Sequence, residues 1–188
     1  RFGVETVEGP SFQILKNGVD TSVVGFDNKK RAEARAELGL SEDSLVLGHV
    51  GRLTEVKNHR FLFKVFSSIH RRVPRSVLLL AGRGELESQL RETAKQMGLS
   101  DSIVFLGIRD DIPSLLSAFD LFIFPSFAEG LPCAVIEAQA SGLPVLLSNG
   151  VPDAARVLPT TIRLDLSSGA DAWAERALQA FDICKSND

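Results

Sequence analysis

Residues 121–144 read LFIFPSFAEGLPCAVIEAQASGLP, and this stretch decides the fold class. The apolar run 121–124 predicts a buried strand, and Pro132 stands at the first position expected for a helix that begins near Cys133. That helix should end at Ser141, where a Gly-Leu-Pro sequence follows. A buried strand that turns directly into a helix is the repeating unit of a parallel sheet.

The same unit recurs along the chain. Short apolar runs predict further buried strands over residues 45–50, 77–81, 103–106 and 145–148, and shorter marginal strands over 14–15 and 162–164. Stretches with apolar residues at helical spacing predict helices over 30–38, 62–73, 86–97 and 170–183. We therefore predict an α/β fold with a doubly wound, Rossmann-like parallel sheet, in a single domain over residues 1–188.

Composition narrows the function classes. Hydrophobic residues make up 44% of the 188 residues and charged residues 24%, which is typical of a globular domain. With 21 basic and 24 acidic residues the chain has a net charge of −3, so we expect no nucleic-acid partner. Two cysteines are too few for a disulfide framework, and no apolar run reaches the roughly 18 residues of a membrane span. These features predict a cytoplasmic location.

Two cations follow the expected strand 45–50. Arg52 comes directly after Gly51, and Lys57 precedes the next helix. An arginine and a lysine at the carboxyl end of a strand suit a phosphorylated ligand, although a solvated loop would explain them as well. Arg109 follows the next strand but one, after Gly107 and Ile108, and an exposed loop arginine would also explain that residue.

Two carboxylates bracket the turn after residues 121–124. Glu129 lies in the turn, and Glu137 lies about one helical turn into the helix. The backbone amides of Cys133 and Ala134 in the first turn of the helix form a potential anion site. A carboxylate such as Glu137 on an apolar helix is either buried with partners or faces a ligand with hydroxyl groups.

Several polar residues are predicted to be structural. Asp110 or Asp111 should cap the helix that begins near residue 112, and no Asp-x-Asp sequence ends a strand, so no metal site is expected. His49 lies within an apolar strand and should be a core histidine, whereas His59 is expected at the surface. The basic run 29–31 is expected to form a solvated face.

A series of motifs in one order carries a family resemblance. They are Asn17–Asp20, Gly51-Arg52 with Lys57-Asn58, Gly82–Gly84, Phe105–Gly107, Phe124–Ser126, Glu129–Pro132 and Glu137-Ala138. The chain resembles, from about residue 14 to residue 173, the C-terminal half of a GT-B-fold retaining glycosyltransferase of family four. That half binds the nucleotide-sugar donor.

The resemblance implies a role for each matching residue. Arg52 and Lys57 would contact the donor diphosphate and, with Glu129 on the donor sugar, would form the catalytic set. Glu137 would hold the ribose. The remaining donor contacts would be Gly107, Ile108 and Arg109 at the base, and Gly130, Leu131, Cys133 and Ala134 around the phosphates.

The resemblance also implies the reaction. The parent enzyme would move a hexosyl group from a nucleotide sugar, UDP-linked by expectation, to a carbohydrate or lipid-linked acceptor in polysaccharide biosynthesis. It would need neither a metal nor another cofactor. A preceding domain, of which residues 1–13 would be the tail, would bind the acceptor and supply any peripheral membrane contact. The present chain would then bind donor without completing the transfer.

Three alternatives stay open at this point. Two are GT-B relatives with other chemistry, a nucleotide-sugar 2-epimerase and a glycogen-type phosphorylase, although the phosphorylase needs a cofactor-binding lysine in a different context. The third is a non-enzymatic, flavodoxin-like regulatory domain, which needs an aspartate at the end of an early strand. Here that strand ends in Gly51-Arg52.

Overall fold

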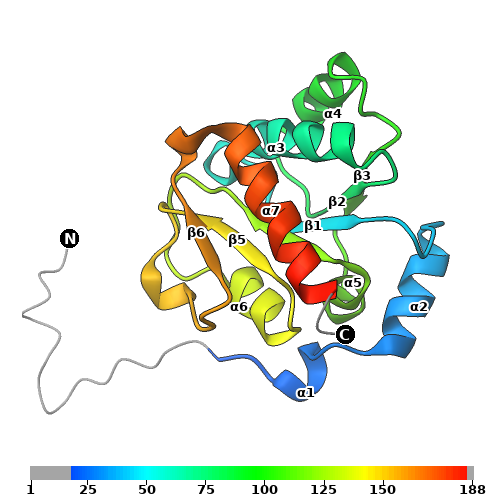
Figure 1. The fold of residues 1–188 in the computed structure, drawn as a ribbon, viewed down its shortest axis with the longest axis vertical. Coiled ribbons are helices and arrows are strands. Elements are labelled where there is room, and N and C mark those ends of the chain that lie inside the picture. Colours follow the sequence, from blue (N-terminus) through cyan, green and yellow to red (C-terminus); the bar gives the residue numbers. More distant parts are fainter. Residues whose placement is uncertain (1–17, 186–188) are drawn as a thin grey trace, which may run out of the picture.

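The computed structural model of the protein describes residues 18–185, so the expected strand 14–15 and the expected domain tail 1–13 lie outside the described residues. Figure 1 shows the arrangement of the elements around a central sheet. The strands are β1 (Val46–Val50), β2 (Val77–Ala81), β3 (Ile103–Gly107), β4 (Leu121–Phe124), β5 (Val145–Ser148) and β6 (Ile162–Leu164). All neighbouring strands pair in parallel. Each internal strand expected from the apolar runs is therefore confirmed to within one residue.

The order of the strands is β3-β2-β1-β4-β5-β6. The chain adds strands on one side of β1 and then returns to add β4, β5 and β6 on its other side, which confirms the doubly wound prediction. A flavodoxin-like domain has the order 2-1-3-4-5 and is excluded. Because the direction of winding reverses between β1 and β4, ligands of such sheets bind beyond the carboxyl ends of these two strands.

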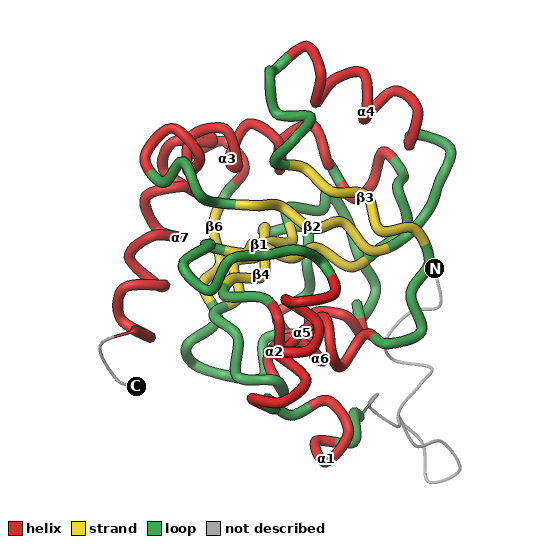
Figure 2. Tube along the Cα trace, turned by 90° about the vertical axis from the view of Figure 1, so that its right-hand side faces the viewer, coloured by secondary structure: helices red, strands yellow, loops and turns green. Residues whose placement is uncertain are grey.

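Helices cover both faces of the sheet, as Figure 2 shows. On one face lie α3 (His59–Arg72), α4 (Glu87–Gln96) and α7 (Gly169–Lys185), and on the other lie α1 (Thr21–Val24), α2 (Asn28–Glu37), α5 (Ile112–Ala118) and α6 (Cys133–Ala140). The predicted helices are confirmed, with ends that differ by up to three residues. Of these helices, α1 alone had no sequence prediction.

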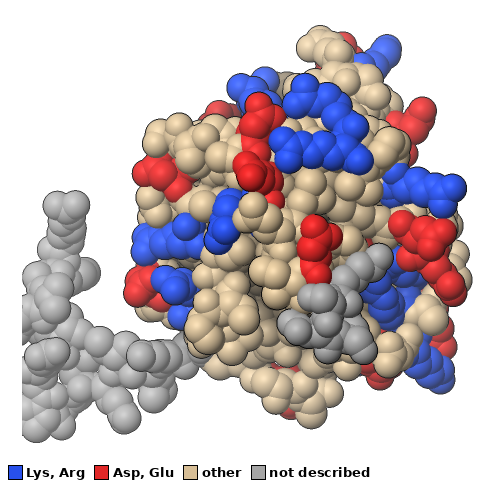
Figure 3. Space-filling view, viewed as in Figure 1, with Lys and Arg blue, Asp and Glu red and all other residues tan. Residues whose placement is uncertain are grey.

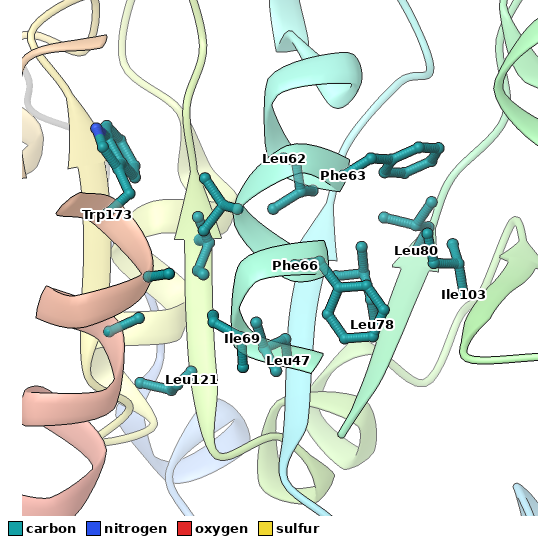
Figure 4. Close-up of a cluster of buried hydrophobic side chains, with 14 of the residues drawn as sticks. Leu47, Leu62, Phe63, Phe66, Ile69, Leu78, Leu80, Ile103, Leu121 and Trp173 are labelled. Carbon is teal, nitrogen blue, oxygen red and sulfur yellow. The ribbon is translucent and has the colours of Figure 1, made fainter. Parts of the chain in front are cut away.

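The core consists of two apolar layers, because side chains of a strand point alternately to its two faces. Leu78 and Leu80 of β2 pack with α3, α4 and α7, whereas Leu79 packs with α5 and α6. Figure 4 shows the first layer, in which Phe66 of α3 and Trp173 of α7 lie over the strands. Both of these side chains are fully buried, so this layer holds α3 and α7 against the sheet.

The basic run 29–31 is not a uniformly solvated face, so that prediction is wrong for Arg31. Its guanidinium donates to the carbonyls of Ser117 and Phe119 and to Asp120 Oδ1, at 2.6 Å. Arg35, one turn later, is buried and donates to Asp120 Oδ2 at 2.7 Å. The charges of α2 therefore tie this helix to the start of β4, a contact between distant residues that a local pattern does not reveal.

Elsewhere the surface carries both signs of charge. On the face that Figure 3 shows, Lys and Arg (blue) are interspersed with Asp and Glu (red). That face therefore lacks the continuous basic patch with which proteins follow a nucleic-acid backbone.

Candidate functional site

The loops after β1 and β4 meet at the point where the sheet reverses its winding. The side-chain amide of Asn58 donates to the Pro125 carbonyl at 3.2 Å, and the Phe127 amide donates to the Val56 carbonyl at 2.8 Å. Asn58 has a φ of 55°, a left-handed conformation that asparagine tolerates better than most residues. This conformation lets the chain turn from the loop directly into α3. The two hydrogen bonds between the loops make them one continuous surface.

Lys57 and Glu129 face each other across this junction. Lys57 Nζ lies 2.8 Å from Glu129 Oε1, and the two side chains are only 18% and 12% exposed. Lys57 Nζ also lies 4.5 Å from the centre of the Phe124 ring, a cation–π contact. Arg52 is exposed, and its side chain makes no ion pair within residues 18–185. The structure thus brings together two residues of the predicted catalytic set and leaves the third open to a ligand.

The loop after β2 lies against the loop after β1 through bare backbone. A Cβ atom built on Gly82, whose φ is 138°, would lie 2.0 Å from the Gly51 carbonyl oxygen. A Cβ atom on Gly84 would lie 2.2 Å from the Leu53 carbonyl oxygen, and the Leu53 amide donates to the Arg83 carbonyl at 3.0 Å. The Gly-Arg-Gly sequence therefore permits a close backbone contact that positions the segment carrying Arg52.

The loop after β3 lies at the same edge of the sheet as the loops after β1, β2 and β4, and together these loops are called the rim. The Gly82 amide donates to the Gly107 carbonyl at 2.7 Å, and Ile108 beside it is 70% exposed. Arg109 donates twice to Asp111, at 2.7 Å each, and once to Glu37 at 3.0 Å. These hydrogen bonds, first to Asp111 and then to Glu37, raise the pKa of Arg109 above its usual value. A role for Arg109 at a nucleotide base stays a prediction.

The prediction that Asp110 or Asp111 caps α5 is wrong. Asp111 occupies the N-cap position, but its side chain makes no capping hydrogen bond. The carboxylate instead binds Arg109, and this hydrogen bond is the main cause that lowers the pKa of Asp111. An arginine fork two residues away offers two charged donors, which compete with one backbone amide.

The other predicted residues lie on the loop 129–132 and on α6. The Glu129 amide donates to the Gly150 carbonyl at 3.0 Å, which ties this loop to the one after β5. Pro132 is the N-cap of α6 and supplies no side-chain cap to the turn of Cys133 and Ala134. Glu137 is half-buried, and its carboxylate makes no hydrogen bond or ion pair within the described range. Gly130 and Leu131 complete the same loop, and the ligand contacts of all these residues stay predictions.

Two histidines lie beneath the Lys57–Glu129 contact. His49 is buried, as predicted, and its Nδ1 donates to the Ile123 carbonyl at 2.9 Å, so the bare Nε2 is a hydrogen-bond acceptor. No partner for Nε2 lies within residues 18–185. The prediction for His59 was wrong, because this side chain is also buried, with its ring centre 4.7 Å from that of His49. The left-handed turn at Asn58 places the first residue of α3 under the loop, where sequence spacing suggested surface.

Burial keeps both rings neutral. Desolvation lowers the pKa of His49 to about 4 and that of His59 to about 2. Below pH 6.5 the unfolded chain binds protons on these rings while the folded chain does not. The free energy of unfolding therefore decreases as the pH is lowered. Each ring should contribute about 1.4 kcal/mol per pH unit to this loss.

Urea denaturation of wild type and His59→Leu between pH 7.5 and pH 5 tests this expectation. The variant should lose less stability over that interval, by about 2 kcal/mol. Val23→Ala, at an exposed residue without a titratable side chain, is the control and should keep the wild-type slope. A His59→Leu slope equal to that of wild type would contradict the assignment.

Sequence reasoning missed two residues of this rim. Arg83 is exposed, and its Nε lies 3.3 Å from the position of a Cβ on Gly107, so a third cation lies near the predicted donor site. Ser126 is fully buried, and its Oγ has no partner among the described residues. A cation inside a Gly-x-Gly turn at a strand end is the one signal that could have identified Arg83.

Residues 18–185 contain neither a metal-binding cluster nor a membrane-spanning helix. No cluster of three or more His, Cys, Asp and Glu side chains there has the arrangement of a metal site. In the same range, no helix combines the length and the apolar character that crossing a bilayer requires.

Comparison with known proteins gives relatives for most of the chain. The family model described as "Glycosyl transferases group 1" matches residues 30–163. The chain is 38% identical over 180 residues to the glycosyltransferase EpsF of Bacillus subtilis (strain 168), covering 95% of this chain and 47% of that protein. It is 36% identical over 146 residues to UDP-Gal:alpha-D-GlcNAc-diphosphoundecaprenol alpha-1,3-galactosyltransferase of Escherichia coli, covering 76% of this chain and 38% of that protein.

A solved structure shares the fold. Anabaena HepE in complex with UDP-glucose matches with a TM-score of 0.81 and 22% identity, covering 93% of this chain and 49% of that one. The chain spans about half the length, or less, of the curated relatives named above.

Proposed function

We propose, from the premise that the chain belongs to the family of group 1 glycosyl transferases, that it binds the UDP-linked sugar donor of a retaining hexosyltransferase. The observation that carries this proposal is the junction of the loops after β1 and β4. There an exposed Arg52, a Lys57 and a Glu129 carboxylate gather where a doubly wound sheet binds its ligand.

The chemistry of the rim fits such a donor. Arg52 and Lys57 supply positive charge for a diphosphate, and the uncapped first turn of α6 adds amides and the positive end of its dipole. Glu129 and Glu137 supply acceptors for hydroxyl groups, Glu129 for the sugar and Glu137 for the ribose. Loop 107–109, with the exposed Ile108, would seat the base.

The proposed reaction is transfer of the hexosyl group with retention at the anomeric carbon. The bond from this carbon to the diphosphate oxygen breaks, a bond to the acceptor oxygen forms, and the acceptor proton passes to the departing phosphate oxygen. Arg52 and Lys57 would stabilise the charge that develops on the diphosphate. Half or more of each relative named above has no counterpart in this chain. In the parent enzyme, the corresponding region would bind a carbohydrate or lipid-linked acceptor.

Calorimetric titration of the chain with UDP and with uridine tests the donor site. Arg52→Ala should weaken UDP binding by about 1.5–3 kcal/mol, the range for hydrogen bonds to charged groups, and leave uridine binding nearly unchanged. Arg72→Ala, an exposed arginine in the last turn of α3, is the matched control. GDP serves as the comparison nucleotide. Equal losses for UDP and uridine would refute the diphosphate role of Arg52, and a wild-type chain that binds neither UDP nor GDP would refute the proposed function.

A further inference from the structure

Lys57 and Glu129 form an ion pair with each other. The distance of 2.8 Å and the low exposure of both side chains make this a partly desolvated ion pair. Within residues 18–185, the Glu129 carboxylate has Lys57 as its ion-pair partner and no other, and the Lys57 ammonium donates to Glu129 alone. Under the proposed function these same groups serve the diphosphate and the sugar, so donor binding must exchange their partners.

A nucleoside diphosphate alone cannot make this exchange without loss. Phosphate oxygens can take Lys57, but Glu129 would then keep a partly buried charge without its cation, next to new negative charge. An intact nucleotide sugar offers phosphate oxygens to Lys57 and hydroxyl donors to Glu129 at the same time. The nucleotide sugar therefore gives both Lys57 and Glu129 a new partner.

The backbone around the pair is already held in place. The Asn58–Pro125 and Phe127–Val56 hydrogen bonds join the two loops, and the Glu129 amide is bound to Gly150. The exchange of partners therefore requires movement of the side chains alone. The flexible four-carbon stem of Lys57 passes close to Gly51, at 3.3 Å from the position that a Cβ on this glycine would take. It can turn toward a phosphate without a movement of the loop.

We infer that the Lys57–Glu129 pair makes the site discriminate between the intact nucleotide-sugar donor and the nucleoside diphosphate that remains after transfer. This inference rests on the proposed function and goes beyond it, because it assigns a specificity role to the contact between the two residues. When the sugar leaves, Glu129 loses its hydroxyl partners and regains Lys57, which weakens the hold on the departing diphosphate. The pair thus favours donor entry and product release.

The test is calorimetric titration of wild type, Glu129→Gln and Glu137→Gln with UDP and with UDP-glucose, UDP-galactose and UDP-N-acetylglucosamine. Wild type should bind at least one sugar nucleotide more tightly than UDP. Glu129→Gln, which weakens the hold on Lys57, should bind UDP about fivefold more tightly than wild type does. The same change should lower the ratio of sugar-nucleotide to UDP affinity about tenfold. Glu137→Gln removes the same charge without releasing Lys57 and should leave that ratio unchanged.

A double-mutant cycle separates release of Lys57 from simple loss of negative charge. In a Lys57→Met background, Glu129→Gln should tighten UDP binding clearly less than it does in the wild-type background, because only the repulsion between Glu129 and the diphosphate is left to remove, whereas an effect of charge alone would keep its full size. An undiminished effect overturns the inference, as does a wild-type chain that binds UDP as tightly as every sugar nucleotide. A purely structural ion pair would give Glu129→Gln an unchanged ratio, which also overturns it. None of these outcomes coincides with the failure of the proposed function, in which wild type binds neither UDP nor GDP.

Discussion

Replacing Asp120 by alanine is expected to lower the free energy of unfolding by about 3–5 kcal/mol, the range for removing one partner of a buried ion pair. Asp120 accepts from Arg31, from Arg35 and, at 2.7 Å, from the Val46 amide at the start of β1. Arg35 is 5% exposed, and burial is the main cause that lowers its pKa. Without Asp120 the charge of Arg35 would stay buried beside that of Arg31.

Urea denaturation at pH 7 measures this loss. Asp43→Ala is the matched control, because Asp43 pairs with Arg75 at 3.3 Å where both side chains are more than 70% exposed. The control should cost less than about 1 kcal/mol. If Asp120→Ala costs no more than Asp43→Ala, the network does not anchor α2 to the sheet in the way we describe.

Replacing Gly82 by alanine should damage both stability and donor binding. The new Cβ would lie 2.0 Å from the Gly51 carbonyl oxygen, and the φ of 138° is one that L residues rarely adopt. We expect a loss of stability of about 3 kcal/mol or more, from backbone strain and from displacement of the segment 51–53. Because this segment carries Arg52, affinity for UDP should fall at least as far as in Arg52→Ala.

Gly98→Ala separates strain from displacement. Gly98 has a φ of 69° at the end of α4, but a Cβ there would meet no atom within 4 Å. Its replacement should cost about 1–3 kcal/mol of strain and leave UDP binding unchanged. Circular dichroism melting and calorimetry on both variants measure the two effects. A Gly82→Ala protein that melts like Gly98→Ala and binds UDP normally would show that the close contact does not position the loop.

The fold could be predicted from the sequence because its signals are local. Runs such as Leu121–Phe124 are apolar throughout, as strands buried on both faces must be, and glycine or proline ends the segments that follow. The positions of single polar residues were harder to predict. His59 begins an amphipathic helix with a polar neighbour on each side, yet the turn at Asn58 buries it.

The candidate site could be predicted as a set of residues but not as a set of contacts. Arg52, Lys57 and Glu129 follow strand ends, and parallel strands bring such ends to one edge of the sheet. The ion pair between Lys57 and Glu129 joins residues that are far apart in the chain, and it depends on how two loops dock. The prediction that Asp110 or Asp111 caps α5 failed for another reason. A capping residue and an ion-pair partner have the same sequence signature, and only geometry separates them.

The backbone contacts among the loops at the carboxyl ends of the strands have a consequence for the thermodynamics of recognition. Gly107 is bound to Gly82, Gly82 touches Gly51, and Glu129 is bound to Gly150. A binding site whose frame is held by its own backbone contacts spends little conformational entropy on ordering when a nucleotide enters. Differences in affinity among nucleotides should therefore reflect the enthalpy and desolvation of individual side-chain contacts. Single substitutions on this rim should then change the rate of dissociation more than the rate of association.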